Sequence, residues 1–177
     1  DTPILPKHLL IELNFDWEEE KVWGSTTYEL KVSANGIQEI KMDAANLEID
    51  QVRIGGKRVS FENTGEKVTI FLPKQLKAGA AIKVKLNHSV SKPAAGIYFT
   101  KPDKEYPDRF KTVWTQGQDE DSKYYFPCFD QPNFKQTTEV KLHLPKGMFG
   151  LSNGRLLKKI SFASKNFYPA SYNHFRT

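Results

Sequence analysis

Apolar and polar residues alternate with a period of two through much of the chain, and this pattern constrains the fold more than any other feature. Such alternation places the apolar side chains on one face of an extended strand, whereas a helix needs apolar residues at spacings of three and four. Seven segments show it: 8–15, 25–32, 39–42, 47–54, 67–72, 81–86 and 138–144. The sequence therefore predicts an all-β protein.

Pairs of turn-forming residues separate these segments at the places where a hairpin or short loop is needed. They are Asn35-Gly36, Gly55-Gly56, Thr64-Gly65 and Ala78-Gly79. Little helix is expected, with Pro73 to Ala78 as a candidate for one helical turn, and Pro93 to Pro107 is predicted to be a long ordered loop. The pattern favours a sandwich-like arrangement or a large curved antiparallel sheet.

Length and composition indicate one ordinary folded domain. A chain of 177 residues with 38% hydrophobic, 12% aromatic and 27% charged residues can bury a core, unlike a disordered or collagen-like chain. No apolar run approaches the roughly 18 residues of a membrane span, so a soluble protein is expected. Because Asp1-Thr2-Pro3 has neither an initiator methionine nor the layout of a signal peptide, we expect the first residue to be a boundary set by processing or cloning.

The net charge of +5 raises the question of a nucleic-acid partner. The lysines, however, alternate with apolar residues in strand-like runs such as Ile82 to Leu86. This arrangement is typical of the solvated face of a sheet. The pattern therefore favours a solvated face, and no nucleic-acid partner is predicted.

The histidines do not have the spacing of a hydrolytic zinc site, which usually needs two histidines one helical turn apart and a third ligand. They are isolated along the chain, at His8, His88, His143 and His174. An isolated strand histidine is more often a structural or surface residue than a ligand. We therefore predict no metal ligand, no cofactor and no catalytic residue in this chain.

The single cysteine, Cys128, lies among apolar neighbours in Phe126-Pro127-Cys128-Phe129 and has no activating base near it in the sequence. We interpret it as a buried structural thiol. One cysteine cannot form an internal disulfide, so the localisation stays open between a cytoplasmic and a periplasmic compartment.

The segment from Trp114 to Pro132 is dense in both polar and aromatic residues. Gln116 and Gln118 flank Gly117, so a bend there could turn both side-chain amides toward one cavity. Each amide offers a carbonyl acceptor and two donors, which suits recognition of a small polar group. Taken on the residues alone, the plainer alternative is favoured, a polar loop whose glutamines bond to nearby backbone.

The same segment resembles the signature of the amino-terminal domain of zinc aminopeptidases of the aminopeptidase N type. These are gluzincin metallopeptidases, a family that also includes leukotriene hydrolase, and the likeness is to bacterial members. In that signature Thr-Gln-x-Glu/Gln precedes Phe-Pro-Cys-x-Asp-x-Pro, and Thr115 to Gln118 and Phe126 to Pro132 match it without a gap. Looser matches at 95–99, 134–138 and 151–154 extend the resemblance over roughly residues 4 to 157.

The resemblance implies a saddle-shaped, mainly antiparallel β-domain that packs against a thermolysin-like catalytic domain and caps one side of its active-site cavity. Residues 1–157 are assigned to this domain. Residues 158–177 no longer follow the family pattern and are assigned to a divergent or truncated tail of the same domain. The paired-histidine zinc helix of such enzymes does not occur in this sequence. The resemblance therefore implies zinc in a catalytic domain outside this chain, and no hydrolysis by this chain alone.

In such enzymes acidic side chains of the catalytic domain hold the substrate's free α-amino group together with one Glu or Gln of the amino-terminal domain. By resemblance that residue is Gln118, as in the leukotriene hydrolase branch. Gln116 would line the pocket for the first substrate side chain, and Gly117 would keep that wall open because it has no Cβ. The implied partners are the amino terminus of a peptide substrate and the chain's own catalytic domain.

Two alternatives come from other classes of protein. One is a scaffold or binding module that keeps the fold without hydrolysis. The other is a generic β-sandwich that binds carbohydrate or protein. A reading frame that continues into a paired-histidine zinc helix would exclude the first of them, and binding of sugars without any response to peptides would favour the second.

Overall fold

The structure, a computed structural model, describes residues 3–131, 134–161 and 171–177. Within these residues the chain forms thirteen strands and one short 3-10 turn. The elements are β1 (Ile4–Asp16), β2 (Lys21–Val32), β3 (Ile37–Asp43), β4 (Glu48–Ile54), β5 (Lys57–Arg58), β6 (Phe61–Asn63), β7 (Lys67–Leu76), β8 (Ala81–Ser91), β9 (Ile97–Thr100), β10 (Thr112–Thr115), η1 (Ser122–Tyr124), β11 (Thr137–Leu144), β12 (Arg155–Ser161) and β13 (Ser171–Arg176).

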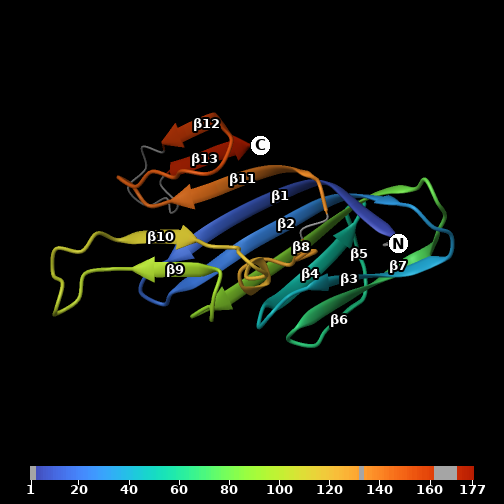
Figure 1. Ribbon diagram of the computed structural model, residues 1–177, viewed down its shortest axis with the longest axis horizontal. Helices are drawn as coiled ribbons and strands as arrows, with labels where there is room; N and C mark the ends of the chain where they lie inside the picture. The colour runs from blue at the N-terminus through green and yellow to red at the C-terminus, as the bar shows by residue number, and fades with distance from the viewer. Residues whose placement is uncertain (1–2, 132–133, 162–170) are drawn as a thin grey trace.

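Eight strands form one large sheet in the order β12-β13-β11-β1-β2-β8-β4-β5. Neighbouring strands are antiparallel except for β1 and β11, which run parallel. Two smaller sheets, β10-β9 and β3-β7-β6, lie at opposite ends of the large sheet (Figure 1). The prediction of an all-β, mainly antiparallel domain with little helix is confirmed.

The alternating segments fold as predicted, because six of the seven lie wholly in a strand and the seventh, 47–54, begins one residue before β4. Two local predictions are corrected. Pro73 to Ala78 does not form a helical turn, since β7 continues to Leu76 and pairs with Ile37 of β3 across a bulge. Pro73, which has no N–H to donate, lies in the irregular part of that pairing. The loop predicted from Pro93 to Pro107 contains β9.

One core cluster joins the large sheet to the β3-β7-β6 sheet and to Ile97 of β9. On β1 the residues Leu9, Ile11, Leu13 and Phe15 are all buried, as period-two alternation requires. They join one cluster with residues of β2, β8, β3 and β7, chiefly Tyr28, Leu30, Val84, Leu86, Ile40, Met42, Val68 and Ile70. No helix among the described residues is long and apolar enough to cross a membrane.

The end of the chain contributes β12 and β13 to the large sheet. Glu139 of β11 holds β13 in place, because its carboxylate accepts hydrogen bonds from Arg176 Nε at 2.6 Å and pairs with His174 Nε2 at 2.6 Å. Burial by itself would raise the pKa of Glu139, but these hydrogen bonds outweigh it and lower the pKa. The domain boundary at residues 157 and 158 stays a prediction, and its tail includes residues 162–170, which lie outside the described residues.

Candidate substrate-binding site

The predicted site residues follow the β9–β10 hairpin directly. In this hairpin Trp114 lies opposite Tyr98 and Thr115 opposite Ile97. The pairing continues one residue beyond the strand, because the backbone N–H of Gln116 donates to the carbonyl of Gly96 at 2.9 Å. The structure therefore places Gln116 at the end of a hydrogen-bonded ladder, with its backbone held by the hairpin.

Gly117 begins a closed turn that leads into η1. The N–H of Asp121 donates to the carbonyl of Gly117 at 3.3 Å. A Cβ at Gly117 would lie 2.6 Å from Ser122 Oγ, closer than real Cβ contacts allow. Glycine at this position therefore makes room for Ser122, a packing reason that sequence reasoning missed. Gln118, the next residue, precedes a cis peptide bond to Asp119.

Both glutamine side chains are exposed. Among the described residues neither amide forms a hydrogen bond with a protein group, so the alternative in which the glutamines bond to nearby backbone is not seen. The turn thus presents two amides to the outside, and each can donate and accept hydrogen bonds.

A partly buried tyrosine, which packs against the core, joins this turn to the hairpin. The hydroxyl of Tyr125 is hydrogen-bonded to Ser122 and to Thr115, and burial raises the pKa of Tyr125 to about 12. Gly96 reinforces the junction, because its φ of +78° and lack of a side chain let the backbone carbonyl of Asp121 approach it closely. Sequence reasoning included Gly96 in the resemblance but did not predict this contact.

The second half of the signature fastens the turn to β3. Cys128 and Asp43 exchange two backbone hydrogen bonds, of 2.8 and 3.0 Å. The carboxylate of Asp130 accepts the backbone N–H of Lys123 at 3.1 Å and so satisfies one backbone donor of η1. Asp130 also donates its own N–H to the carboxylate of Asp43 at 3.2 Å. The segment from Phe126 to Asp130 therefore supports the turn structurally.

The buried position predicted for Cys128 is confirmed. Burial, with the nearby carboxylates of Asp130 and Asp43, raises the pKa of the Cys128 thiol well above its usual range. Since the thiolate is the reactive form, we expect an aromatic disulfide reagent near neutral pH to label native Cys128 at least about 100-fold more slowly than the urea-unfolded chain. Equal labelling rates would contradict a buried, protonated thiol.

The histidines lie in separate environments. His88 is buried and its Nε2 pairs with Thr26 Oγ1 at 2.8 Å. The other three bond to neighbouring strands, His8 to Thr137, His143 to Glu12 and His174 to Glu139. In the part of the chain that the structure describes, no three His, Cys, Asp or Glu side chains converge to hold a metal ion. These residues therefore do not fit the zinc ion that the resemblance implies for the parent enzyme.

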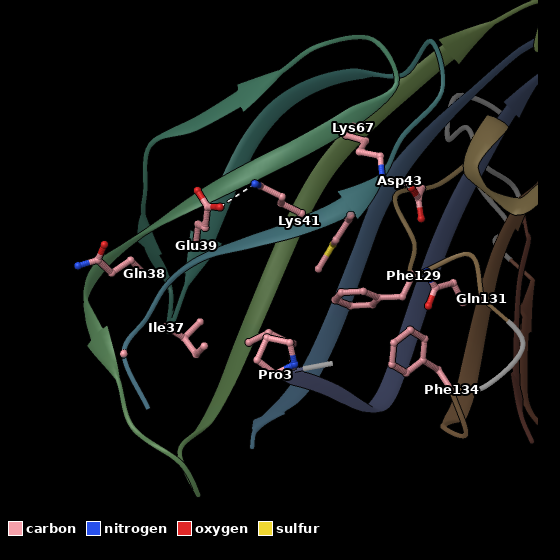
Figure 2. Close-up of a pocket in the computed structure, with 13 residues that line it drawn as sticks. Pro3, Ile37, Gln38, Glu39, Lys41, Asp43, Lys67, Phe129, Gln131 and Phe134 are labelled. Carbon is pink, nitrogen blue, oxygen red and sulfur yellow. Dashed lines mark ion pairs between the residues drawn. The ribbon is translucent and has the colours of Figure 1, made fainter. Parts of the chain in front are cut away.

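Two hollows on the molecule lie near this segment without containing the predicted residues. One, of about 720 Å³, lies between β3 and the residues after Cys128, and Figure 2 shows the ion pair of Glu39 and Lys41 on one side of it and Phe129 with Phe134 on the other. The other, of about 1190 Å³, lies on the apolar side of β1 and β11 and reaches Trp114. Neither is lined by Gln116, Gly117 or Gln118. The candidate site is therefore an exposed turn that lines neither of these hollows.

The fold and the turn together define an all-β domain that carries two exposed amides at the end of a hairpin. Residues 5–169 match the Peptidase M1 N-terminal domain, and the chain belongs to this family. The resemblance found in the sequence is thereby confirmed.

Named relatives are longer proteins. Leucine aminopeptidase 2 of Yarrowia lipolytica is 26% identical over 144 residues, which are 77% of this chain and 22% of that protein. Mitochondrial aminopeptidase 2 of Saccharomyces cerevisiae is 25% identical over 158 residues, which are 85% of this chain and 17% of the relative. The chain thus spans about a fifth of the length of these relatives.

Solved structures show the same fold. The M1 zinc metallopeptidase from Deinococcus radiodurans superposes with a TM-score of 0.79 at 15% identity, over 99% of this chain and 39% of that one. Yeast LTA4 hydrolase in complex with bestatin gives a TM-score of 0.76 at 18% identity, over 98% of this chain and 26% of that one. At these identities the likeness establishes the architecture alone.

Proposed function

We propose that this chain is the amino-terminal domain of a zinc-dependent aminopeptidase and supplies part of the site that binds the free amino group and first side chain of a peptide. The observation that carries the proposal is the pair of exposed, unengaged amides of Gln116 and Gln118 on a turn held by Gly96 and Tyr125. Family membership and the aminopeptidase names of the relatives support it.

Gln118 is proposed to accept a hydrogen bond from the substrate's α-ammonium group. An ammonium has three donors, and a neutral carbonyl oxygen satisfies one of them while carboxylates of the catalytic domain take the others. Gln116 and Gly117 are proposed to border the first side chain. A preformed turn suits this role, because its backbone needs no reordering when substrate binds.

The partner in this proposal is the catalytic domain of the same protein, which would hold the zinc ion and perform hydrolysis. This chain by itself is expected to be inactive. Sequencing the gene beyond the codon for Thr177 tests the parentage. A paired-histidine zinc helix in the continuing frame supports the aminopeptidase, and a frame that closes without one supports the scaffold module instead.

Gln118→Glu in the full-length enzyme should lower the KM for aminoacyl substrates by about 3-fold or more, because a carboxylate makes a stronger, charge-assisted hydrogen bond to the ammonium. Steady-state kinetics on aminoacyl coumarylamides measure the effect. Gln131→Glu is the matched control, since it adds the same charge at an exposed position outside the turn. Unchanged KM in Gln118→Glu, or the same change in the control, would remove Gln118 from amine binding.

A further inference from the structure

An aromatic pair stands on the same strand face as Gln116. Thr115 of β10 is exposed, but its side chain bonds to Tyr125, which packs against the core, and its ladder partner Ile97 is buried, so this face of the strand turns toward the core. Side chains alternate along a strand, and the ladder holds its register as far as Gln116. Trp114 and Gln116 therefore both point outward, away from Tyr125.

The ring of Trp114 is stacked on Tyr98, its direct partner across the hairpin. The ring centroids are 4.4 Å apart and the planes are inclined by 25°. Trp114 is nevertheless 50% exposed, so stacking covers one face of the indole and leaves much of the rest open. We call Tyr98 and Trp114 the aromatic platform. An exposed aromatic surface of this kind is costly in water unless something binds to it.

The platform lies within reach of a ligand seated at Gln116. Two residues along a strand correspond to about 6.6 Å between Cα atoms. A large first side chain of a substrate, such as Leu, Met or Phe, covers a comparable distance. The indole of Trp114 further shortens the distance between this side chain and the platform. Stacking and strand pairing also hold the platform in one orientation, so little side-chain entropy is lost when a ligand packs on it.

We propose that the aromatic platform of Tyr98 and Trp114 forms the wall for the far end of the first substrate side chain and makes the enzyme prefer large apolar or aromatic first residues. The proposal rests on the proposed function, because it takes Gln116 as the near border of that side chain. It assigns a specificity role to two residues outside the Gln116 to Gln118 turn. A small first residue such as alanine would not reach the platform.

The test compares Trp114→Ala with the wild type in the full-length enzyme, on Ala, Leu and Phe substrates that share one coumarylamide leaving group. We expect kcat/KM for the Leu and Phe substrates to fall roughly 10-fold and kcat/KM for the Ala substrate to change less than about 2-fold. Trp114→Phe, which keeps a ring for stacking, should lose much less. Phe110→Ala is the matched control, since Phe110 is 83% exposed just before β10 and has no stacking partner among the described residues.

The possible outcomes separate this inference from the function on which it rests. If Trp114→Ala lowers kcat/KM equally for all three substrates, the platform packs against the catalytic domain or supports the fold, and the proposal is overturned. An unchanged ratio of kcat/KM for the Phe substrate to kcat/KM for the Ala substrate overturns the proposal as well. In both cases wild-type activity leaves the proposed function standing, whereas a full-length wild type that cleaves none of the substrates refutes both. If Trp114→Ala fails to fold, the ratio of kcat/KM for the Phe substrate to kcat/KM for the Ala substrate is measured in Trp114→Phe and Tyr98→Leu, and that ratio tests the proposal instead.

Discussion

Gly96→Ala should lower the free energy of unfolding by about 3 kcal/mol, whereas Gly36→Ala should lower it by only about 1 kcal/mol. The two glycines have nearly the same φ, +78° and +79°, so alanine meets the same backbone strain at both. At Gly36 no atom lies within 4 Å of the added Cβ, but at Gly96 the Cβ would lie 2.1 Å from the carbonyl oxygen of Asp121. The difference between the variants therefore isolates the close contact between the hairpin and the glutamine turn.

Urea unfolding of both variants and the wild type, followed by circular dichroism, measures these free energies. The Gly96 variant can relieve the overlap only by moving Asp121, because the atom in the way is backbone rather than a flexible side chain. Equal destabilisation at the two positions would show that the close approach contributes nothing to stability.

Acid should destabilise this protein well before its carboxylates are neutralised, because of His88. Burial lowers the pKa of His88 from 6.5 to about 4. Nε2 pairs with Thr26, but Nδ1 is buried without a hydrogen-bond partner among the described residues, so a proton added there would be left unsatisfied. The native state therefore resists a proton that the unfolded chain accepts.

The direction of the change in stability with pH follows from the linkage between proton binding and folding. The unfolded chain binds the proton near pH 6.5, so the stabilisation from neutral His88 is complete above that pH and is lost as the pH falls toward 4. A shift of this size corresponds to about 3 kcal/mol. The hydrogen bond to His143 lowers the pKa of Glu12 from 4.5. The stabilisation that Glu12 contributes is therefore lost only below pH 4.5.

His88→Gln is the variant for this test, since glutamine can still bond to Thr26 and does not titrate. Unfolding free energies measured at several values between pH 6.5 and 4.5 should fall in the wild type and stay nearly level in the variant. The variant is expected to be less stable than the wild type at neutral pH, so the slope with pH is the quantity to compare. Parallel slopes would mean that another group takes up the proton.

The sequence predicted the long strands well, because one face of each of these strands is buried and this produces the alternation of apolar and polar residues. It did not reveal β9, since Ile97 to Thr100 has no polar alternation and lies among prolines, and β10 is equally short. It also suggested helix at Pro73, where local preference is overridden by pairing of β7 with β3. Short strands of this kind are defined by their partners, which a single sequence does not show.

For the site, the sequence predicted which residues form the turn but not what holds it. The contact of Gly96 with Asp121 and the bonds from Tyr125 to Thr115 and Ser122 join positions that only the folded hairpin brings together. The outward direction of Trp114 likewise depends on the register of β10 with β9. The roles assigned to Gln116, Gly117 and Gln118 remain proposals.

The parallel pairing of β1 with β11 has a consequence for how the chain folds. His8 pairs with Thr137, so β1 can complete its pairing only with a strand that lies more than 100 residues later in the chain. The hairpin of β1 with β2 can form early, because a short loop joins them, but the other edge of β1 stays open until β11 has been synthesised. Closure of the sheet is thus a late event that depends on long-range contact, and nascent chains that end before β11 present that uncovered edge to their neighbours.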